Sequence, residues 1–86
     1  MITQFICFLD HGMTGDEERD RAPIAIGSTR GDALNAGIPR GLWLAAETGT
    51  LEYSQFVTVA QPGLAADEFA HLGATLDAFF AAKLPA

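Results

Sequence analysis

The sequence predicts an α+β domain in which an antiparallel β-sheet of about four strands packs on one long C-terminal helix. Three observations predict it: an apolar run over residues 2–9, a hairpin signal around Thr48-Gly49, and an amphipathic pattern over 64–83. The chain has 86 residues, of which 49% are hydrophobic, so a disordered chain is disfavoured. This length predicts a single domain spanning 1–86.

Residues 2–9 are mainly β-branched and aromatic, and the run is too short for a helix, so they predict a strand. Side-chain alternation places Cys7 and Leu9 on one face and Ile6 and Phe8 on the other. Because both faces are apolar, we expect both to be covered, either by this domain or by another chain.

A polar stretch over 10–21 follows, with five acidic and two basic side chains and two glycines. Twelve residues is long for a connection in a small domain. Such a loop is either a solvated connection or a functional segment.

The middle of the chain predicts a short strand and a short helix. Residues 24–26 are strand-forming, and the preceding Pro23 favours a place at the sheet edge. Thr29 is a candidate N-cap for a helix over 32–36, which Gly37 would end.

A β-hairpin is predicted over the next segment. Apolar runs at 41–47 and 50–60 flank Thr48-Gly49. Glycine readily takes the positive φ that a tight hairpin turn requires. We therefore expect two further antiparallel strands here.

The last segment, 64–83, predicts the long helix. Asp67 and Glu68 lie in its first turn and Lys83 in its last, which suits the helix dipole. At about 100° per residue, its large apolar side chains fall on one stripe. These are Phe69, Leu72, Leu76, Phe79 and Phe80.

One long helix covers only one face of such a sheet, so the other face is predicted to be an interface. The apolar residues expected there are Ile6, Phe8, Trp43 and Phe56. A short chain has a marginal core of its own, which also favours a homodimer or a partner protein.

The net charge of −6 restricts the kind of partner. Direct binding of nucleic acid is disfavoured because phosphate-binding domains are normally basic. Acidic side chains instead steer a protein towards basic partners. The loop acids expected to do this are Asp16, Glu17, Glu18 and Asp20.

No residue pattern predicts catalysis, a metal or a cofactor. Cys7 and His11 are four residues apart, about 13 Å along a strand, too far for a thiol and its base. Cys7 is therefore expected to be a buried structural thiol. The acids around His11 do not match a calcium-loop pattern. The stretch 27–32 lacks the Gly-Lys-Ser/Thr of a nucleotide-binding loop.

The sequence has no apolar run of membrane-spanning length, and its first residues lack the positive charges of a signal peptide. Its single cysteine excludes an internal disulfide. These features predict a cytoplasmic protein that does not act in a membrane.

The stretch 41–59, with its strand, acidic-Thr-Gly turn and second strand, followed by the amphipathic helix, resembles class I type III secretion chaperones. The chain departs from that family in opening with a strand. The resemblance implies a small, acidic, cytoplasmic homodimer that binds a segment of an effector protein.

Two functions from different classes remain open. One is a non-enzymatic protein-binding module of the secretion-chaperone type. The alternative is an acidic inhibitor of the kind phages carry, of the anti-CRISPR or DNA-mimic class, which blocks a basic nucleic-acid-binding enzyme. An enzyme or metal-binding protein centred on His11 is a third and weaker hypothesis.

Overall fold

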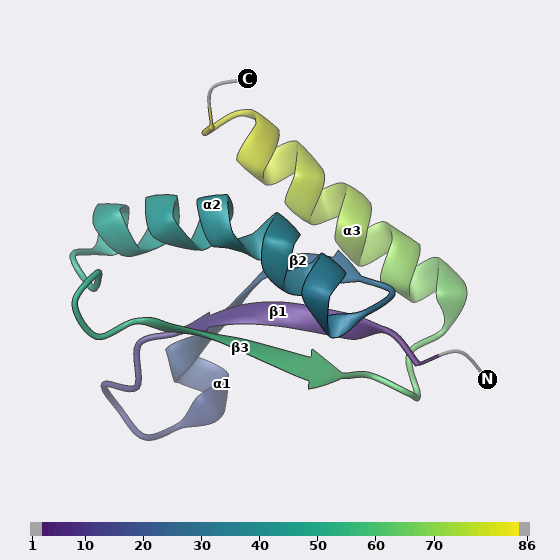
Figure 1. Ribbon diagram of the computed structural model, residues 1–86, viewed down its shortest axis with the longest axis horizontal. Helices are drawn as coiled ribbons and strands as arrows, with labels where there is room; N and C mark the ends of the chain where they lie inside the picture. The colour runs from purple at the N-terminus through teal and green to yellow at the C-terminus, as the bar shows by residue number, and fades with distance from the viewer. Residues whose placement is uncertain (1–2, 85–86) are drawn as a thin grey trace.

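The structure is a computed structural model that describes residues 3–84. Its elements are β1 (Phe5–Asp10), α1 (Glu17–Asp20), β2 (Arg21–Gly27), α2 (Arg30–Thr48), β3 (Gln55–Ala60) and α3 (Ala66–Ala81). The three strands form one antiparallel sheet in the order β2-β1-β3 (Figure 1). The protein is therefore α+β, with three strands in place of the four expected.

Both long helices lie on the same side of the sheet. Figure 1 shows α2 and α3 above the strands, while the four-residue α1 lies below them. α2 crosses all three strands, and α3 packs beside β2. The lower face, called here the helix-free face, therefore carries α1 as its only helix among residues 3–84.

The main core lies between the sheet and α2. Cys7 and Ile24 are fully buried there. α2 presents to them a row of small buried residues spaced four apart: Ala33, Gly37, Gly41 and Ala45. A Cβ at Gly37 would lie 2.7 Å from the Cys7 sulfur. The small residues therefore allow the helix backbone to approach the strands closely.

The helix expected over 32–36 continues through Gly37 to Thr48, which corrects the sequence prediction. Gly37 was expected to stop the helix, yet packing of its bare backbone against Cys7 stabilises the helical conformation. Pro39 lies inside the helix, where it removes one backbone hydrogen bond. The predicted N-cap is confirmed, since the Thr29 hydroxyl accepts a hydrogen bond from the Asp32 amide at 3.0 Å.

The predicted hairpin is wrong. Residues 41–47 belong to α2, and Gly49 ends that helix with φ of 72° in the left-handed region. The positive φ inferred for this glycine is thus present, but it terminates a helix instead of joining two strands. The strand expected over 50–60 is the shorter β3, which pairs with β1. The segment that resembles the chaperone hairpin is accordingly helical in its first half.

The ends of the chain agree better with the sequence. The strand predicted over 2–9 is β1, although residue 2 lies outside the described residues. The predicted edge strand is β2, and the predicted C-terminal helix is α3. Leu76 and Phe80 of its apolar stripe are buried, as their spacing indicates.

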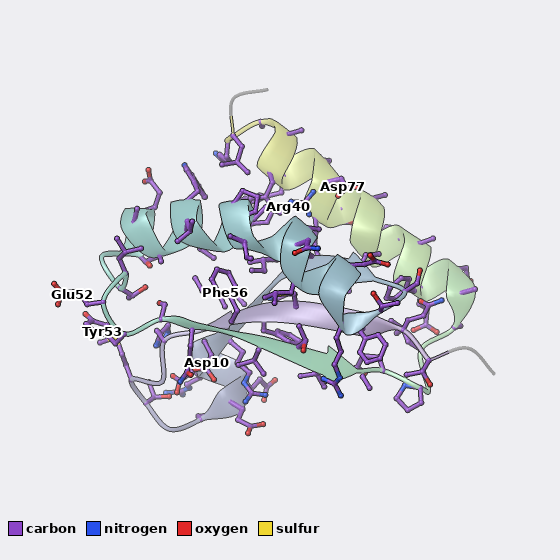
Figure 2. All side chains as sticks on the ribbon, in the orientation of Figure 1. Asp10, Arg40, Glu52, Tyr53, Phe56 and Asp77 are labelled. Atoms are coloured by element: carbon purple, nitrogen blue, oxygen red, sulfur yellow. The ribbon has the colours of Figure 1, made fainter. Side chains whose placement is uncertain are left out.

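Arg40 joins three elements on the helix side of the sheet. Its guanidinium donates to the Ile24 carbonyl oxygen at 3.0 Å and to the Asp77 carboxylate at 2.6 Å, and lies over the Phe80 ring. Figure 2 shows Arg40 of α2 beside Asp77 of α3. This side chain thus fixes α3 against α2 and β2.

Candidate functional site on the helix-free face

Apolar side chains of β1 and β3 form the floor of the helix-free face. The register pairs Ile6 with Val59 and Phe8 with Val57, so these side chains lie on the same face. Ile6 is only 7% exposed yet is not part of the main core. Phe8 and the two valines are half-buried. This face therefore leaves apolar surface within reach of water.

An open hollow of about 360 Å³ lies over this floor and is bordered by α1. Phe8 and Val59 give it an apolar base. Its polar wall contains Glu17 and Glu18 of α1, with Arg21 and Gln61. The structure thus brings together two groups of residues that the sequence proposed separately, the apolar strand residues and the loop acids.

The charge of the wall is mainly negative. Arg21 bonds to Asp10 through its Nε at 2.9 Å and approaches Glu17 at 3.5 Å. The Glu17 side chain is nevertheless 77% exposed. Glu18 has no basic side chain within 4.0 Å among residues 3–84. Arg21 therefore lies beside two carboxylates, Asp10 and Glu17, and the wall keeps a net negative charge that can attract a cationic partner.

Asp20 holds the loop that carries this acidic wall. Its carboxylate accepts from the Thr14 hydroxyl at 2.7 Å, the Thr14 amide at 3.1 Å and the Gly15 amide at 2.9 Å. The Thr14 hydroxyl in particular lowers the pKa of Asp20, because its hydrogen bond favours the charged form. The side chain is 3% exposed, so its charge interacts with groups of this loop and not with solvent.

The remaining loop acid, Asp16, starts α1. Its side chain accepts a hydrogen bond from the Glu18 amide at 3.0 Å. It also lies 3.9 Å from the Arg19 guanidinium, with 55% of its side chain exposed. Asp16 therefore shapes the wall and adds to its charge.

Three of the proposed contact residues do not lie on this face. Trp43 projects from α2 and packs edge-on against Phe79 and Phe80, with ring centroids 6.5 and 6.2 Å away. Phe56 lies on the helix side, where its ring fills the space beside Gly41 (Figure 2). Asp20 is buried, so it cannot meet a partner. Of the other predicted contact residues, Phe8, Glu17 and Glu18 line the hollow, Asp16 lies beside them at the start of α1, and Ile6 is on this face but buried.

Sequence reasoning missed Val59, Arg21 and Gln61. Side chains alternate between the two faces of a strand, so Val59 and Phe56, three residues apart, lie on opposite faces. Because Phe56 was predicted to lie on the open face, Val59 was assigned to the covered one. The correct parity depends on which face the helices cover. Arg21 directly follows α1 in the chain and caps it, whereas Gln61 follows β3 and only the fold brings it to the hollow.

The geometry around Cys7 and His11 does not form a nucleophile and base. Cys7 is fully buried, and burial raises the pKa of its thiol. The His11 Nδ1 accepts the Met13 amide at 3.2 Å and lies 3.7 Å from Asp20. Because this Nδ1 accepts a hydrogen bond from the Met13 amide, it does not donate one to the Asp20 carboxylate, as a catalytic dyad would require.

Within residues 3–84, no three His, Cys, Asp or Glu side chains lie close enough together to hold a metal ion. No helix in that part of the chain has the length and apolar character needed to cross a membrane.

Comparison with known proteins gives no relatives from which to transfer a function. No protein-family model matches the chain, and no characterised protein or solved structure is significantly similar to it. The site must therefore be interpreted from its own geometry.

Proposed function

We propose that this chain is a non-enzymatic protein-binding module that holds a basic, partly apolar segment of another protein on its helix-free face. The observation that carries the proposal is the juxtaposition of the Phe8–Val59 floor with the exposed carboxylates of Glu17 and Glu18. Lysine or arginine side chains of the partner would meet the acids, and its apolar side chains would lie on the floor.

The two parts of the site contribute differently to binding. Exposed carboxylates on a chain of net charge −6 attract a basic segment before contact, an effect that salt screens. Burial of apolar surface on Phe8 and Val59 then supplies affinity that salt does not weaken. Binding should therefore be salt-sensitive in its rate of association and less so in its rate of dissociation.

Binding of an effector segment, which the resemblance to secretion chaperones implies, is one form of this proposal. Two of the apolar contact residues expected for such a module, Trp43 and Phe56, lie on the helix side of the sheet. The client surface in this proposal is the helix-free face.

A fluorescent peptide of alternating lysine and leucine tests the proposal by anisotropy titration. We expect it to bind, and a glutamate–leucine peptide not to bind. Replacing Glu17 and Glu18 with glutamine should weaken binding about tenfold at low salt. The matched control replaces Asp67 and Glu68 of α3, which removes the same charge far from the site and should change affinity much less.

A second variant tests the apolar floor. Val59→Ser should weaken the same peptide about tenfold, because it replaces apolar contact surface with a hydroxyl. Leu51→Ser is the control, since Leu51 is 55% exposed and lies outside the hollow. Equal affinities for the basic and the acidic peptide, or equal effects of the site and control variants, would refute the proposal.

The row of acids at Asp16, Glu17 and Glu18 favours a second candidate, an inhibitor that occupies the nucleic-acid channel of a basic enzyme. The carboxylates would then stand in for phosphates. This candidate predicts competition with DNA and a strong salt dependence. Val59→Ser separates the two, because loss of an apolar contact matters only for the peptide-binding module.

A further inference from the structure

The outer edge of β3 leaves backbone groups without partners. The Gln61 amide donates to the Gln4 carbonyl oxygen at 2.7 Å, which continues the β1–β3 register by one pair. In an antiparallel ladder, alternate residues bond to the same neighbour. The backbone N–H and C=O groups of the odd-numbered residues of β3 therefore point towards β1, and those of Phe56, Thr58 and Ala60 point outwards.

The two edges of the sheet are protected differently. β2 carries Pro23 and a register shift opposite Cys7 and Phe8. A proline and a bulge of this kind prevent an edge from pairing. β3 has the uncharged sequence Gln-Phe-Val-Thr-Val-Ala, with no proline or glycine. Its edge is therefore well suited to accept another strand.

Two of the groups along this edge are already bonded. The Thr58 carbonyl oxygen accepts the Arg30 guanidinium at 3.0 Å. The Ser54 amide donates to the Thr50 carbonyl oxygen at 2.9 Å. Among residues 3–84, no hydrogen bond reaches the Ser54 carbonyl oxygen. The groups left are that carbonyl, the Thr58 amide, and both backbone groups of Phe56 and of Ala60.

We propose that β3 pairs antiparallel with β3 of a second copy of this chain, with Phe56 on the two-fold axis. This register sets Phe56 opposite itself and Thr58 opposite Ser54 of the partner copy. Phe56 then exchanges both hydrogen bonds, and the Thr58 amide donates to the Ser54 carbonyl. The second bond of this pair would run from the Ser54 amide to the Thr58 carbonyl oxygen. It does not form, because the Ser54 amide already donates to Thr50 and the Thr58 carbonyl oxygen already accepts from Arg30. The joined sheet has six strands.

Side chains next to the axis fit this arrangement. Gly41 of α2 lies on the Phe56 ring, and Ile38 and Leu42, on either side of it, are 38% and 50% exposed. At 100° per residue both lie on the flank of α2 opposite Arg40, which faces β2 and α3. That flank borders β3, so both copies would cover exposed apolar surface.

Charge also favours a second copy in this register. The alignment sets Ala60 opposite Glu52 of the partner copy. Arg30, which reaches Thr58 and stacks over the Phe5 ring, lies at that end of the strand. Figure 2 shows Glu52 at the opposite end of β3, directed away from the body of the molecule. Two-fold symmetry therefore brings each Arg30 towards a Glu52, against the repulsion of two acidic chains.

Light scattering after size-exclusion chromatography tests the proposal on the full chain at about 100 µM, a concentration suited to a weak dimer. We expect a mass of twice 9.1 kDa. Thr58→Pro should give the monomer mass with unchanged circular dichroism, because it removes an outward amide and leaves the β1 pairing intact. Thr58→Val, which keeps that amide, should remain a dimer. A wild-type monomer, or a Thr58→Pro dimer, would overturn the proposal.

Hydrogen exchange keeps the test decisive if Thr58→Pro fails to fold. In the wild-type protein, the Phe56 and Thr58 amides should become protected as concentration rises, while the Thr75 amide of α3 is unaffected. Exchange that does not depend on concentration would exclude the pairing. The proposed peptide site lies on the helix-free face, so its failure in the Val59→Ser titration is independent of this result.

The register has its own test. Hydrogen-bonded antiparallel pairs have Cα atoms about 5.5 Å apart, which suits a disulfide. The Ser54→Cys/Thr58→Cys double variant should therefore cross-link two chains in oxidised glutathione, and Thr58→Cys alone should not. Cross-linking of Thr58→Cys alone would move the axis to Thr58 and overturn the register proposed here.

Discussion

The two faces of the sheet differ in how closely they are packed. On the helix side, Gly37 and Gly41 bring a helix backbone directly onto Cys7 and Phe56, with no room for another atom. On the helix-free face, the four-residue α1 is the only helix over the strands within residues 3–84, and the hollow beside Phe8 is open. The close packing of the helix side indicates that it supplies most of the stability, which is consistent with the partner-binding role proposed for the other face.

The largest expected effect is at Gly41 on the helix side. Gly41→Ala should lower the free energy of unfolding by at least about 2 kcal/mol, because its Cβ would overlap the Phe56 ring. Urea denaturation measures it. Gly31→Ala is the control: its nearest neighbour would be 3.9 Å away, and alanine should raise helix stability by about 0.5 kcal/mol. Equal effects at both positions would contradict the close-packing argument.

The next effect is at Arg40. Arg40→Met should cost about 1–2 kcal/mol, because the Ile24 carbonyl oxygen loses its charged donor. Asp77→Asn should cost less than about 0.5 kcal/mol, since Asp77 is 71% exposed. Urea denaturation of the two variants compares them. A greater loss for Asp77→Asn would show that the ion pair, and not the carbonyl contact, fixes α3.

Asp20 makes the free energy of unfolding depend on pH. Its pKa is lowered in the folded protein, so its contribution to stability is present above the ordinary value of 3.8 and lost as pH falls below it. Unfolding free energies at about pH 7 and about pH 3 should therefore differ less in Asp20→Asn than in the wild type. Thr14→Val should also reduce the difference, because the Thr14 hydroxyl is the main cause of the lowered pKa. Wild-type behaviour in both variants would count against this anchor.

The smallest expected effect on stability is at the acidic wall. Replacing Glu17 and Glu18 with glutamine should change the free energy of unfolding by less than about 0.5 kcal/mol, because both side chains are exposed. Thermal unfolding monitored by circular dichroism measures this. A large loss would mean that these acids stabilise the fold, and the contrast between the two faces would fail.

Local sequence signals located the first strand, the Thr29 cap and the last helix, because each depends on neighbours in the chain. They failed at 41–47, where Leu42, Trp43 and Leu44 suit a strand as well as a helix. Packing of the small-residue row on the sheet decides for the helix. The candidate site was partly predictable: Phe8, Glu17 and Glu18 were selected, while Val59 and Arg21 depended on strand parity and on the fold of the loop.

The sequence by itself determined the α+β class, the acidic charge and the positive φ at Gly49, since composition and backbone sterics fix these locally. Only the tertiary structure decided that Gly49 ends a helix and that Phe56 faces inwards. It also placed the acids of α1 over the apolar floor. The physical reason is that a short apolar run is compatible with both a helix and a strand. The buried contacts that each conformation can make then decide which one forms.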